Sequence, residues 1–203
     1  METREVKEEL RRSIRAARTA MTESARARAA EGFAAVVGAL PQVREAAVVA
    51  AYVSRPTEPP TLPLLEHLAA RGTRILLPVL GTGLQREWAW YTGPAELQVQ
   101  APGRPPEPPG PTLPAEALEQ VEAIIAPALA VDTDGRRLGQ GGGWYDRVLE
   151  HAPADACIIA LVFPDEVYDA ATRPLPHEEH DHRVHIAATP AHWRWLGEPH
   201  PAV

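Results

Sequence analysis

Four short apolar segments, separated by stretches with helical periodicity, constrain the fold of this chain more than any other feature. They are AAVVAAYV (46–53), RILLPV (74–79), AIIAPALA (123–130) and ACIIALVF (156–163). Runs of this length that are apolar at almost every position are typical of strands buried on both faces of a sheet. Their alternation with helical segments predicts an α/β fold with a mostly parallel sheet flanked by helices.

The N-terminal segment has the apolar periodicity of an amphipathic helix over residues 4–20. Apolar residues recur there at helical spacing. Lys7 and Arg11 are four residues apart, so they share one face of this helix, and Arg18 lies close to the same stripe. That face is either solvated or part of a binding site.

The remaining elements follow from caps, breakers and alternation. Thr22 is placed to cap an alanine-rich helix that ends before Pro41, and Thr61 is placed to cap a helix that runs to about Ala70 before Gly72. Seven prolines in 101–114 predict a surface excursion. We also expect a strand with one exposed face at 87–93, a short helix at 115–121 and a peripheral strand at 184–188.

Composition excludes several classes of protein. A chain of 203 residues suits a single domain, expected over 1–203. The net charge of −7 argues against a nucleic-acid or membrane-surface partner. No apolar run is long enough to span a bilayer, and the charged N-terminus is unlike a signal peptide. A single cysteine, Cys157, fits a reducing cytoplasmic setting. We expect a cytoplasmic monomer whose partners are small molecules.

The segment RLGQGGGWYDRVL (137–149) places four glycines in five positions directly after a buried strand. Glycine lets backbone amides approach an anion closely and permits the positive φ angles that aim successive amides at one point. A helix that begins near Trp144 adds its N-terminal dipole. Arg137 can hold a phosphate oxygen through two hydrogen bonds, and Asp146 can hold Mg²⁺ against that phosphate. The segment therefore favours a nucleoside triphosphate at the carboxyl ends of the strands.

This loop matches neither the P-loop nor the dinucleotide-binding fingerprint, because its spacing and following residues differ from both. A tight strand-to-helix connection without a ligand would also explain it. The chain contains nineteen arginines but only one lysine, Lys7. Because a compact ammonium differs from a guanidinium in shape and hydrogen bonding, the single lysine either marks a position where that group is required or remains by chance.

The glycine segment LAVDTDGRRLGQGGGWYDRVL (129–149) resembles the signature of the 5-formyltetrahydrofolate cyclo-ligases, also called methenyltetrahydrofolate synthetases. Gln140 departs from the aromatic or basic residue common in that family, and Trp144 from the usual Tyr or Phe. The resemblance spans nearly the whole chain. Further matching segments are KEELR (7–11), YVSRPTEPPT (52–61), LPVL (77–80), EWAWYTG (87–93) and LPHEEHDHRVHIAAT (175–189).

The resemblance implies a fold like that of sugar-phosphate isomerases and CoA transferases. It also implies a reaction in which ATP and Mg²⁺ are used to close 5-formyltetrahydrofolate to 5,10-methenyltetrahydrofolate. The same resemblance implies which residues take part. Lys7, Arg11 and Arg137 would hold the ATP phosphates, with Lys7 and Arg137 as the catalytic pair. Asp146 and Asp181 would bind Mg²⁺. The nucleotide cradle would be Arg137, Leu138, Gly139, Gln140, Gly141, Gly142, Gly143, Trp144 and Tyr145, and the folate wall Val53, Glu58, Trp90 and Tyr145, with Trp88 as a further candidate.

Other interpretations remain open at this point. Trp88 and Trp90 point the same way on a strand, so core packing would explain them equally well. Asp181 can cap a turn and Glu58 can be a loop charge. The segment with His177, His180, His182 and His185 suits a solvated loop better than zinc, because its spacing matches no finger pattern. An isomerase or CoA transferase, or a folate- or nucleotide-binding relative without activity, are the competing functions.

Overall fold

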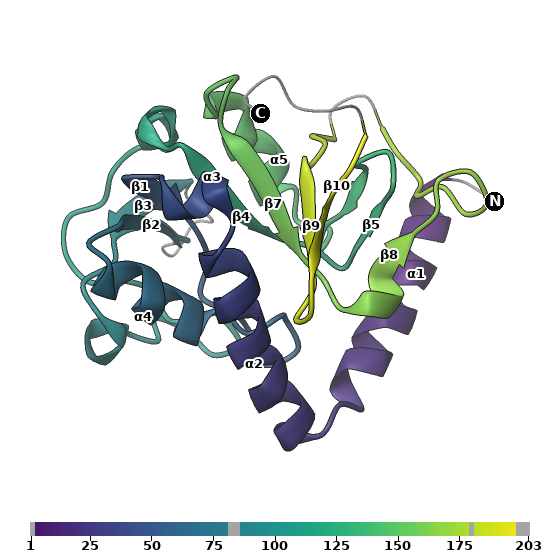
Figure 1. Ribbon diagram of the computed structural model, residues 1–203, viewed down its shortest axis with the longest axis horizontal. Coiled ribbons are helices and arrows are strands. Elements are labelled where there is room, and N and C mark those ends of the chain that lie inside the picture. Colours follow the sequence, from purple (N-terminus) through teal and green to yellow (C-terminus); the bar gives the residue numbers. More distant parts are fainter. Residues whose placement is uncertain (1–2, 81–85, 179–180, 198–203) are drawn as a thin grey trace.

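The computed structural model describes residues 3–80, 86–178 and 181–197, and its centre is a seven-stranded sheet (Figure 1). Five strands are parallel, and the two edge strands β10 and β3 run antiparallel to their neighbours. The mostly parallel α/β sheet predicted from the apolar runs is therefore confirmed. In spatial order the strands are β10 (Trp193–Trp195), β9 (Ile186–Ala188), β7 (Cys157–Leu161), β4 (Ala123–Pro127), β1 (Val48–Ala50), β2 (Arg74–Val79) and β3 (Glu87–Trp90).

Both faces of this sheet are covered, which explains why its strands are apolar at successive positions. In β4, Ile125 belongs to the apolar cluster under one layer, while its neighbour Ile124 belongs to the cluster under the other. The first layer contains α2 (Glu23–Gly38), α3 (Pro41–Arg44) and α4 (Leu62–Ala70). The second contains α5 (Trp144–Val148) and the 3-10 helices η2 (Ala115–Gln120) and η3 (Leu149–His151).

Helix α1 (Thr3–Thr19) lies beside a second, smaller sheet rather than on the main one (Figure 1). This sheet has the order β6 (Arg137–Leu138), β5 (Ala130–Asp132), β8 (Val167–Tyr168). Ile14 of α1 packs there against Leu129 and Leu138. The small sheet thus packs against the N-terminal helix and contains strand β6, which leads directly into the glycine loop.

Several expected elements differ in detail. Thr22 caps α2 as predicted, because its Oγ1 accepts a hydrogen bond from Ala25 N. Thr61 precedes α4 but makes no capping bond, since its hydroxyl donates to Tyr52 O at 2.7 Å. The strand expected to be peripheral at 184–188 is β9, and β10 lies outside it as the true edge. The helix expected at 115–121 is a 3-10 helix.

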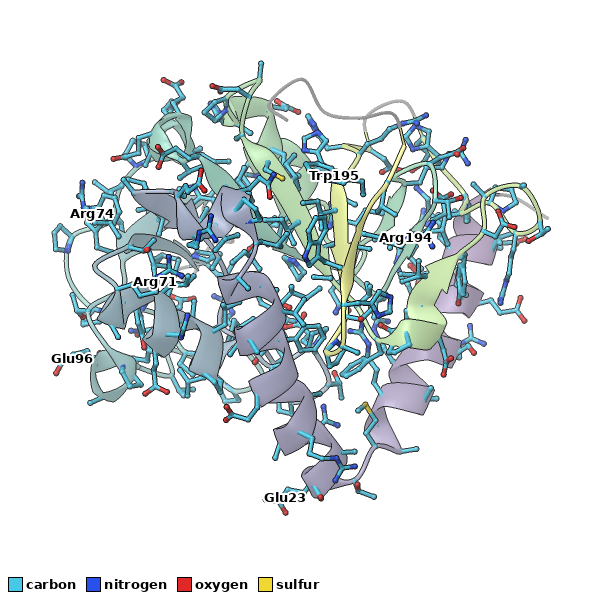
Figure 2. The ribbon with its side chains drawn as sticks, viewed as in Figure 1. Glu23, Arg71, Arg74, Glu96, Arg194 and Trp195 are labelled. Atoms are coloured by element: carbon cyan, nitrogen blue, oxygen red, sulfur yellow. The ribbon has the colours of Figure 1, made fainter. Side chains whose placement is uncertain are left out.

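The proline-rich segment 101–114 lies against the β3 edge of the main sheet. Bridges join Gln98 to Glu107 and Trp88 to Leu113, and Glu107 is buried with its carboxylate accepting from Leu80 N at 3.1 Å. Charged side chains such as Glu23 and Arg74 lie at the periphery (Figure 2). No helix in the described ranges is long and apolar enough to cross a membrane.

Candidate active site

A pocket of about 490 Å³ opens where three parallel strands of the main sheet end. Val53 follows β1, Pro78 lies near the end of β2 and Pro127 ends β4, so these strands supply its floor. Ligands bind in this position in open α/β sheets. The glycine loop, helix α1 and the segment around Asp181 form the other walls.

The glycine loop presents unpaired backbone amides to this pocket. Within the described ranges, no amide of residues 139–143 donates a hydrogen bond to another group of the chain. Gly141 and Gly143 have φ angles of +102° and +62°, which side chains other than glycine adopt only with strain. The expected positive-φ turn is therefore present. The following helix α5 has only five residues, so its dipole is smaller than that of a long helix.

Helix α1 holds the loop by its carbonyl side. Arg11 Nε donates to Gly139 O at 2.9 Å, and Arg15 Nη2 donates to Gln140 O at 2.7 Å. One turn further along, the buried Arg18 donates to Ala128 O at 2.7 Å. Since the carbonyl groups face α1, the amide groups of the same loop remain for a ligand.

Lys7 lies at the start of this basic face and is buried. Its Nζ pairs with Asp181 Oδ2 at 2.8 Å and with Glu178 Oε2 at 2.9 Å. Burial lowers the pKa of Lys7, but hydrogen bonds and charge attraction from Asp181 and Glu178 outweigh it and raise the pKa above the usual value. The structure therefore brings together Lys7 and Asp181, which are 174 residues apart in sequence.

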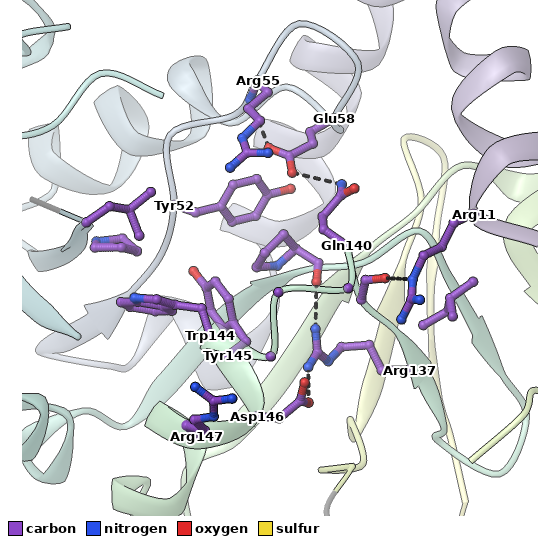
Figure 3. Close-up of a pocket in the computed structure, with 18 of the residues that line it drawn as sticks. Arg11, Tyr52, Arg55, Glu58, Arg137, Gln140, Trp144, Tyr145, Asp146 and Arg147 are labelled. Carbon is purple, nitrogen blue, oxygen red and sulfur yellow. Dashed lines mark hydrogen bonds and ion pairs between the residues drawn. The ribbon is translucent and has the colours of Figure 1, made fainter. Parts of the chain in front are cut away.

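Arg137 spans the end of β4 and the start of α5. Its Nη1 donates to Pro127 O at 3.1 Å, and its Nη2 pairs with the Asp146 carboxylate (Figure 3). Nε is buried without a hydrogen-bond partner in the described part of the chain. A buried guanidinium donor without a partner is costly, so a shift of this side chain that brings Nε to an anionic ligand would be favoured.

Glu58 is buried, with 6% of its surface exposed, on the opposite side of the pocket from Arg137 (Figure 3). Its Oε2 accepts from Arg55 N at 2.9 Å and its Oε1 accepts from Gln140 Nε2 at 3.0 Å. A carboxylate held in this way keeps lone pairs that can receive a pair of ligand N–H groups.

Tyr145 and Trp144 bring aromatic surface to the pocket. The Tyr145 hydroxyl is buried and has no hydrogen-bond partner among the described residues. Burial and the nearby Glu58 carboxylate raise the pKa of this phenol, while Arg137 lowers it less. Trp144 packs edge-on against Trp88, with ring centroids 5.2 Å apart.

Trp90 lies elsewhere. Its ring stacks under the Arg74 guanidinium at 3.8 Å, and it is absent from the pocket wall. The fully buried Trp88 is likewise part of the core and absent from that wall. Trp88 is therefore packed in the core, and Trp90 packs against the same apolar cluster as a partly buried ring beneath Arg74.

Two carboxylates predicted to bind Mg²⁺, Asp146 and Asp181, both line the pocket. Each is paired with a cation, Arg137 and Lys7 respectively. Within residues 3–80, 86–178 and 181–197, no group of three acidic, histidine or cysteine side chains is arranged to hold a metal by itself. Mg²⁺ usually combines one or two carboxylates with substrate phosphates and water, and such a donor set fits these two residues.

The other predicted site residues line the same pocket, as do residues that sequence reasoning missed. The missed wall residues include Tyr52, Arg55 and Arg147. Arg15 was also missed, although it continues the four-residue spacing of Lys7 and Arg11. His180 lies outside the described residues, while His185 accepts a hydrogen bond from Ile158 N. The predicted residues in the wall are Lys7, Arg11, Val53, Glu58, Arg137, Leu138, Gly139, Gln140, Gly141, Gly142, Gly143, Trp144, Tyr145, Asp146 and Asp181.

Comparison with known proteins agrees with this geometry. Residues 3–190 match the model of the 5-formyltetrahydrofolate cyclo-ligase family. The chain is 44% identical over 147 residues to the 5-formyltetrahydrofolate cyclo-ligase of Mycolicibacterium smegmatis, covering 70% of this chain and 73% of that one. It is 33% identical over 174 residues to that of Escherichia coli K12, with 80% and 93% covered.

Solved structures show the same fold. The 5,10-methenyltetrahydrofolate synthetase of Aquifex aeolicus superposes with a TM-score of 0.79 at 28% identity, over 96% of this chain and 94% of that one. The synthetase of Mycoplasma pneumoniae superposes with a TM-score of 0.68 at 16% identity, over 91% and 98%, which supports the fold alone. The family match and the sequence relatives together show that this chain belongs to the 5-formyltetrahydrofolate cyclo-ligase family.

Proposed function

We infer that this chain closes 5-formyltetrahydrofolate to 5,10-methenyltetrahydrofolate with conversion of ATP to ADP and phosphate. Family membership supports the reaction, and one structural observation supports its location. The unpaired amides of residues 139–143 line the same pocket as Lys7, Arg137 and the buried Glu58. That pocket combines an anion site with an acceptor for N–H groups, as a nucleotide and a pterin would require.

The chemistry explains why ATP is needed. An N-formyl group is an amide, so its carbon is a poor electrophile and its oxygen a poor leaving group. We propose that the formyl oxygen attacks the γ-phosphorus, and the bond from that phosphorus to the ADP oxygen breaks. N10 then attacks the formyl carbon and loses its proton, while the C–O bond breaks and phosphate leaves. Alignment of the reacting atoms and charge stabilisation carry most of such a phosphoryl transfer.

On the nucleotide side, the amides of residues 139–143 would bind phosphate oxygens, assisted by Lys7 and by the unpaired Arg137 Nε. Leu138, Trp144 and Tyr145 would complete the cradle. Arg11 binds the Gly139 carbonyl, and we assign it a role in holding the loop as well as in attracting the phosphates. Lys7 and Arg137 are the residues proposed to act on the transferred group.

Mg²⁺ would be held between the phosphates and the carboxylates of Asp146 and Asp181. When bound, it neutralises phosphate charge. Both carboxylates now face cations, so binding of the nucleotide with its metal would exchange partners. Lys7 and Arg137 would turn to the phosphates, and the two aspartates would turn to the metal.

On the folate side, Glu58 would accept two N–H groups from the pterin edge, with Val53 beside the ring. Tyr145 would contact the flat ring and offer its unpaired hydroxyl. Trp90, which stacks on Arg74 outside the pocket wall, is no longer assigned to the folate.

A direct assay separates this function from the two alternatives. The protein is incubated with 5-formyltetrahydrofolate, ATP and Mg²⁺, and the absorbance band of the methenyl product is followed. Product that requires ATP supports the cyclo-ligase. An isomerase or CoA transferase would need no ATP, and a binding relative without activity would retain both ligands but form no product. A Gly142→Trp variant, whose bulky side chain would occupy the open space beside the loop, serves as the negative control.

A further inference from the structure

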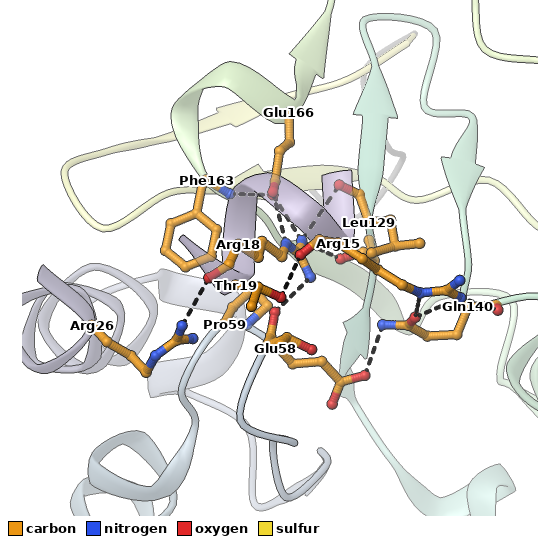
Figure 4. Close-up of polar contacts among 12 residues, drawn as sticks. Arg15, Arg18, Thr19, Arg26, Glu58, Pro59, Leu129, Gln140, Phe163 and Glu166 are labelled. Atoms are coloured by element: carbon orange, nitrogen blue, oxygen red, sulfur yellow. Dashed lines mark hydrogen bonds and ion pairs between the residues drawn. The ribbon is translucent and has the colours of Figure 1, made fainter. Parts of the chain in front are cut away.

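A continuous chain of hydrogen bonds connects helix α1 to Glu58 through the side chain of Gln140. Arg15 donates to two oxygens of Gln140. One bond reaches the backbone O at 2.7 Å, and two reach the side-chain Oε1 at 3.2 and 3.3 Å. Gln140 Nε2 then donates to Glu58 Oε1 at 3.0 Å. Figure 4 shows this path running from Arg15 through Gln140 to Glu58.

The orientation of the Gln140 amide follows from its neighbours. A guanidinium can only donate and a carboxylate can only accept, so the amide oxygen must face Arg15 and the NH₂ group must face Glu58. Gln140 is therefore held at both ends of its side chain. Lysine and arginine have no acceptor for Arg15, and phenylalanine has neither an acceptor nor a donor, so none of these residues could replace the Gln140 amide.

Gln140 belongs to both halves of the pocket, the glycine loop and the wall that contains Glu58. Its own amide lies in the row 139–143 that faces the pocket, while its side chain fixes one oxygen of Glu58. The other oxygen of Glu58 is fixed by Arg55 N at 2.9 Å. The side chain of Gln140 thus ties the glycine loop to the carboxylate across the pocket.

We propose that Gln140 is a positioning residue that couples the nucleotide site to the folate site. This inference rests on the proposed assignment of the loop to ATP and of Glu58 to the pterin. A nucleotide that orders the loop also fixes Gln140, and Gln140 in turn fixes the Glu58 carboxylate in the orientation that receives the pterin. Each ligand then strengthens binding of the other by the same factor, because such coupling is reciprocal.

The test measures this factor by calorimetry. The Kd of 5-formyltetrahydrofolate is determined with and without a non-hydrolysable ATP analogue and Mg²⁺, and the ratio of the two values is the coupling factor. For the wild type we expect a factor of about five or more, within the usual range for coupled sites. A structural defect elsewhere would change both values of Kd but leave their ratio unaltered.

Three variants separate the two ends of the chain of hydrogen bonds. Gln140→Leu keeps the size but removes both side-chain bonds, and Gln140→Glu keeps the acceptor for Arg15 but places a second carboxylate beside Glu58. Arg15→Leu removes the support from α1. We expect the coupling factor to fall to about one in Gln140→Leu and Gln140→Glu, and to fall partly in Arg15→Leu. The exposed Gln100, outside the pocket wall, gives the matched control Gln100→Leu, which should keep the wild-type factor.

The outcomes are distinct. Wild-type coupling that persists in both Gln140 variants, or a wild type without coupling, would overturn the inference. Gln140 is only partly buried, and thermal unfolding verifies that each variant is folded. Failure of the proposed function shows separately, as wild-type protein that forms no methenyl product. An enzyme that forms product but shows no coupling keeps its function and loses only this role of Gln140.

Discussion

Lys7 Nζ lies 2.8 Å from Asp181 Oδ2, so the one lysine of the chain forms an ion pair with a predicted metal ligand inside the pocket. The same arrangement recurs on the other side of the loop, where Arg137 pairs with Asp146. Lys7 and Arg137, the two cations proposed to act on the transferred group, are therefore each matched with a carboxylate in this structure. A polyanion and its metal can enter such a site by exchange of partners, in which the cations turn to the phosphates and the carboxylates turn to the metal.

Replacing Lys7 with Met should weaken binding of ATP far more than binding of folate. The Kd for a non-hydrolysable ATP analogue should rise about ten- to a hundredfold, as expected for loss of a hydrogen bond to a charged group. The Kd for 5-formyltetrahydrofolate, measured alone by calorimetry, should change less than about threefold.

Lys7→Arg is the informative control for this prediction. It keeps the charge but replaces the compact ammonium with a planar group, so ATP affinity should be recovered only in part. Equal losses of both affinities in Lys7→Met would contradict the assignment of Lys7 to the nucleotide.

The buried ion pair of Arg18 and Glu166 should be critical for stability. Arg18 and Glu166 are 2% and 6% exposed, and Nε and Nη2 of Arg18 donate to the two carboxylate oxygens at 2.7 Å each. Arg18→Ala leaves Glu166 buried without its cation, which should lower the free energy of unfolding by about 3–5 kcal/mol.

Denaturant unfolding tests this value against a surface pair. Arg44 and Glu45 form an ion pair with side chains 55% and 70% exposed, so Arg44→Ala should cost less than about 1 kcal/mol. If the two arginine variants lose similar stability, the buried network does not hold α1 in place.

Alanine substitutions should distinguish two roles of the glycine loop. Gly141 has a φ of +102°, so Gly141→Ala should lower the free energy of unfolding by about 1–2 kcal/mol and also reduce ATP affinity. Gly142 has no positive φ and no neighbour within 4 Å of an added Cβ, so Gly142→Ala should keep stability but reduce ATP affinity. Gly72, with a φ of +87° outside the pocket, should show the opposite pattern: lower stability with normal ATP binding.

Replacing Tyr145 with Phe should leave stability at neutral pH within about 1 kcal/mol of the wild type, because the lost hydroxyl has no partner among the described residues. Burial raises the pKa of this phenol, so the folded state keeps its proton while the unfolded state ionises near pH ~10. The wild type therefore loses stability as pH rises above about 10, and Tyr145→Phe should lose less.

Activity provides the second measurement on this variant. If the hydroxyl contacts the folate, kcat/KM should fall about two- to tenfold. Unchanged kcat/KM together with unchanged alkaline stability would mean that the phenol oxygen neither meets the substrate nor stays protonated on folding.

The strands of the main sheet could be predicted because burial on both faces leaves a continuous apolar run. RILLPV predicted β2 with the bounds that the structure has, at 74–79. The small sheet could not be predicted, since β6 and β8 have two residues each and are too short to show the alternation of apolar and polar residues that marks a strand. β10 was also missed, because its residues lie at the sheet edge and are mostly exposed, so they form no apolar run.

Site residues could be predicted where their role depends on residue type. Prediction failed where the role depends on which residues lie next to them in space. The glycines and the single lysine pointed to the loop and to Lys7, while Glu58 was expected only from the family resemblance. The period of β3 placed Trp88 and Trp90 on one side, but it could not reveal that Arg74, from the adjacent strand, stacks on Trp90. Arg15 was overlooked although it continues the spacing of Lys7 and Arg11, because nothing in the sequence reveals that its acceptors are the backbone and side-chain oxygens of Gln140.

The grip of α1 on the loop carbonyls has an electronic consequence. A guanidinium bound to a carbonyl oxygen draws electron density through that peptide unit, which makes its N–H more acidic and a stronger donor. Arg11 acts in this way on the peptide between Gly139 and Gln140, and Arg15 on the peptide between Gln140 and Gly141. Polarisation of these two units would let both arginines strengthen the binding of an anion at the amides of Gln140 and Gly141.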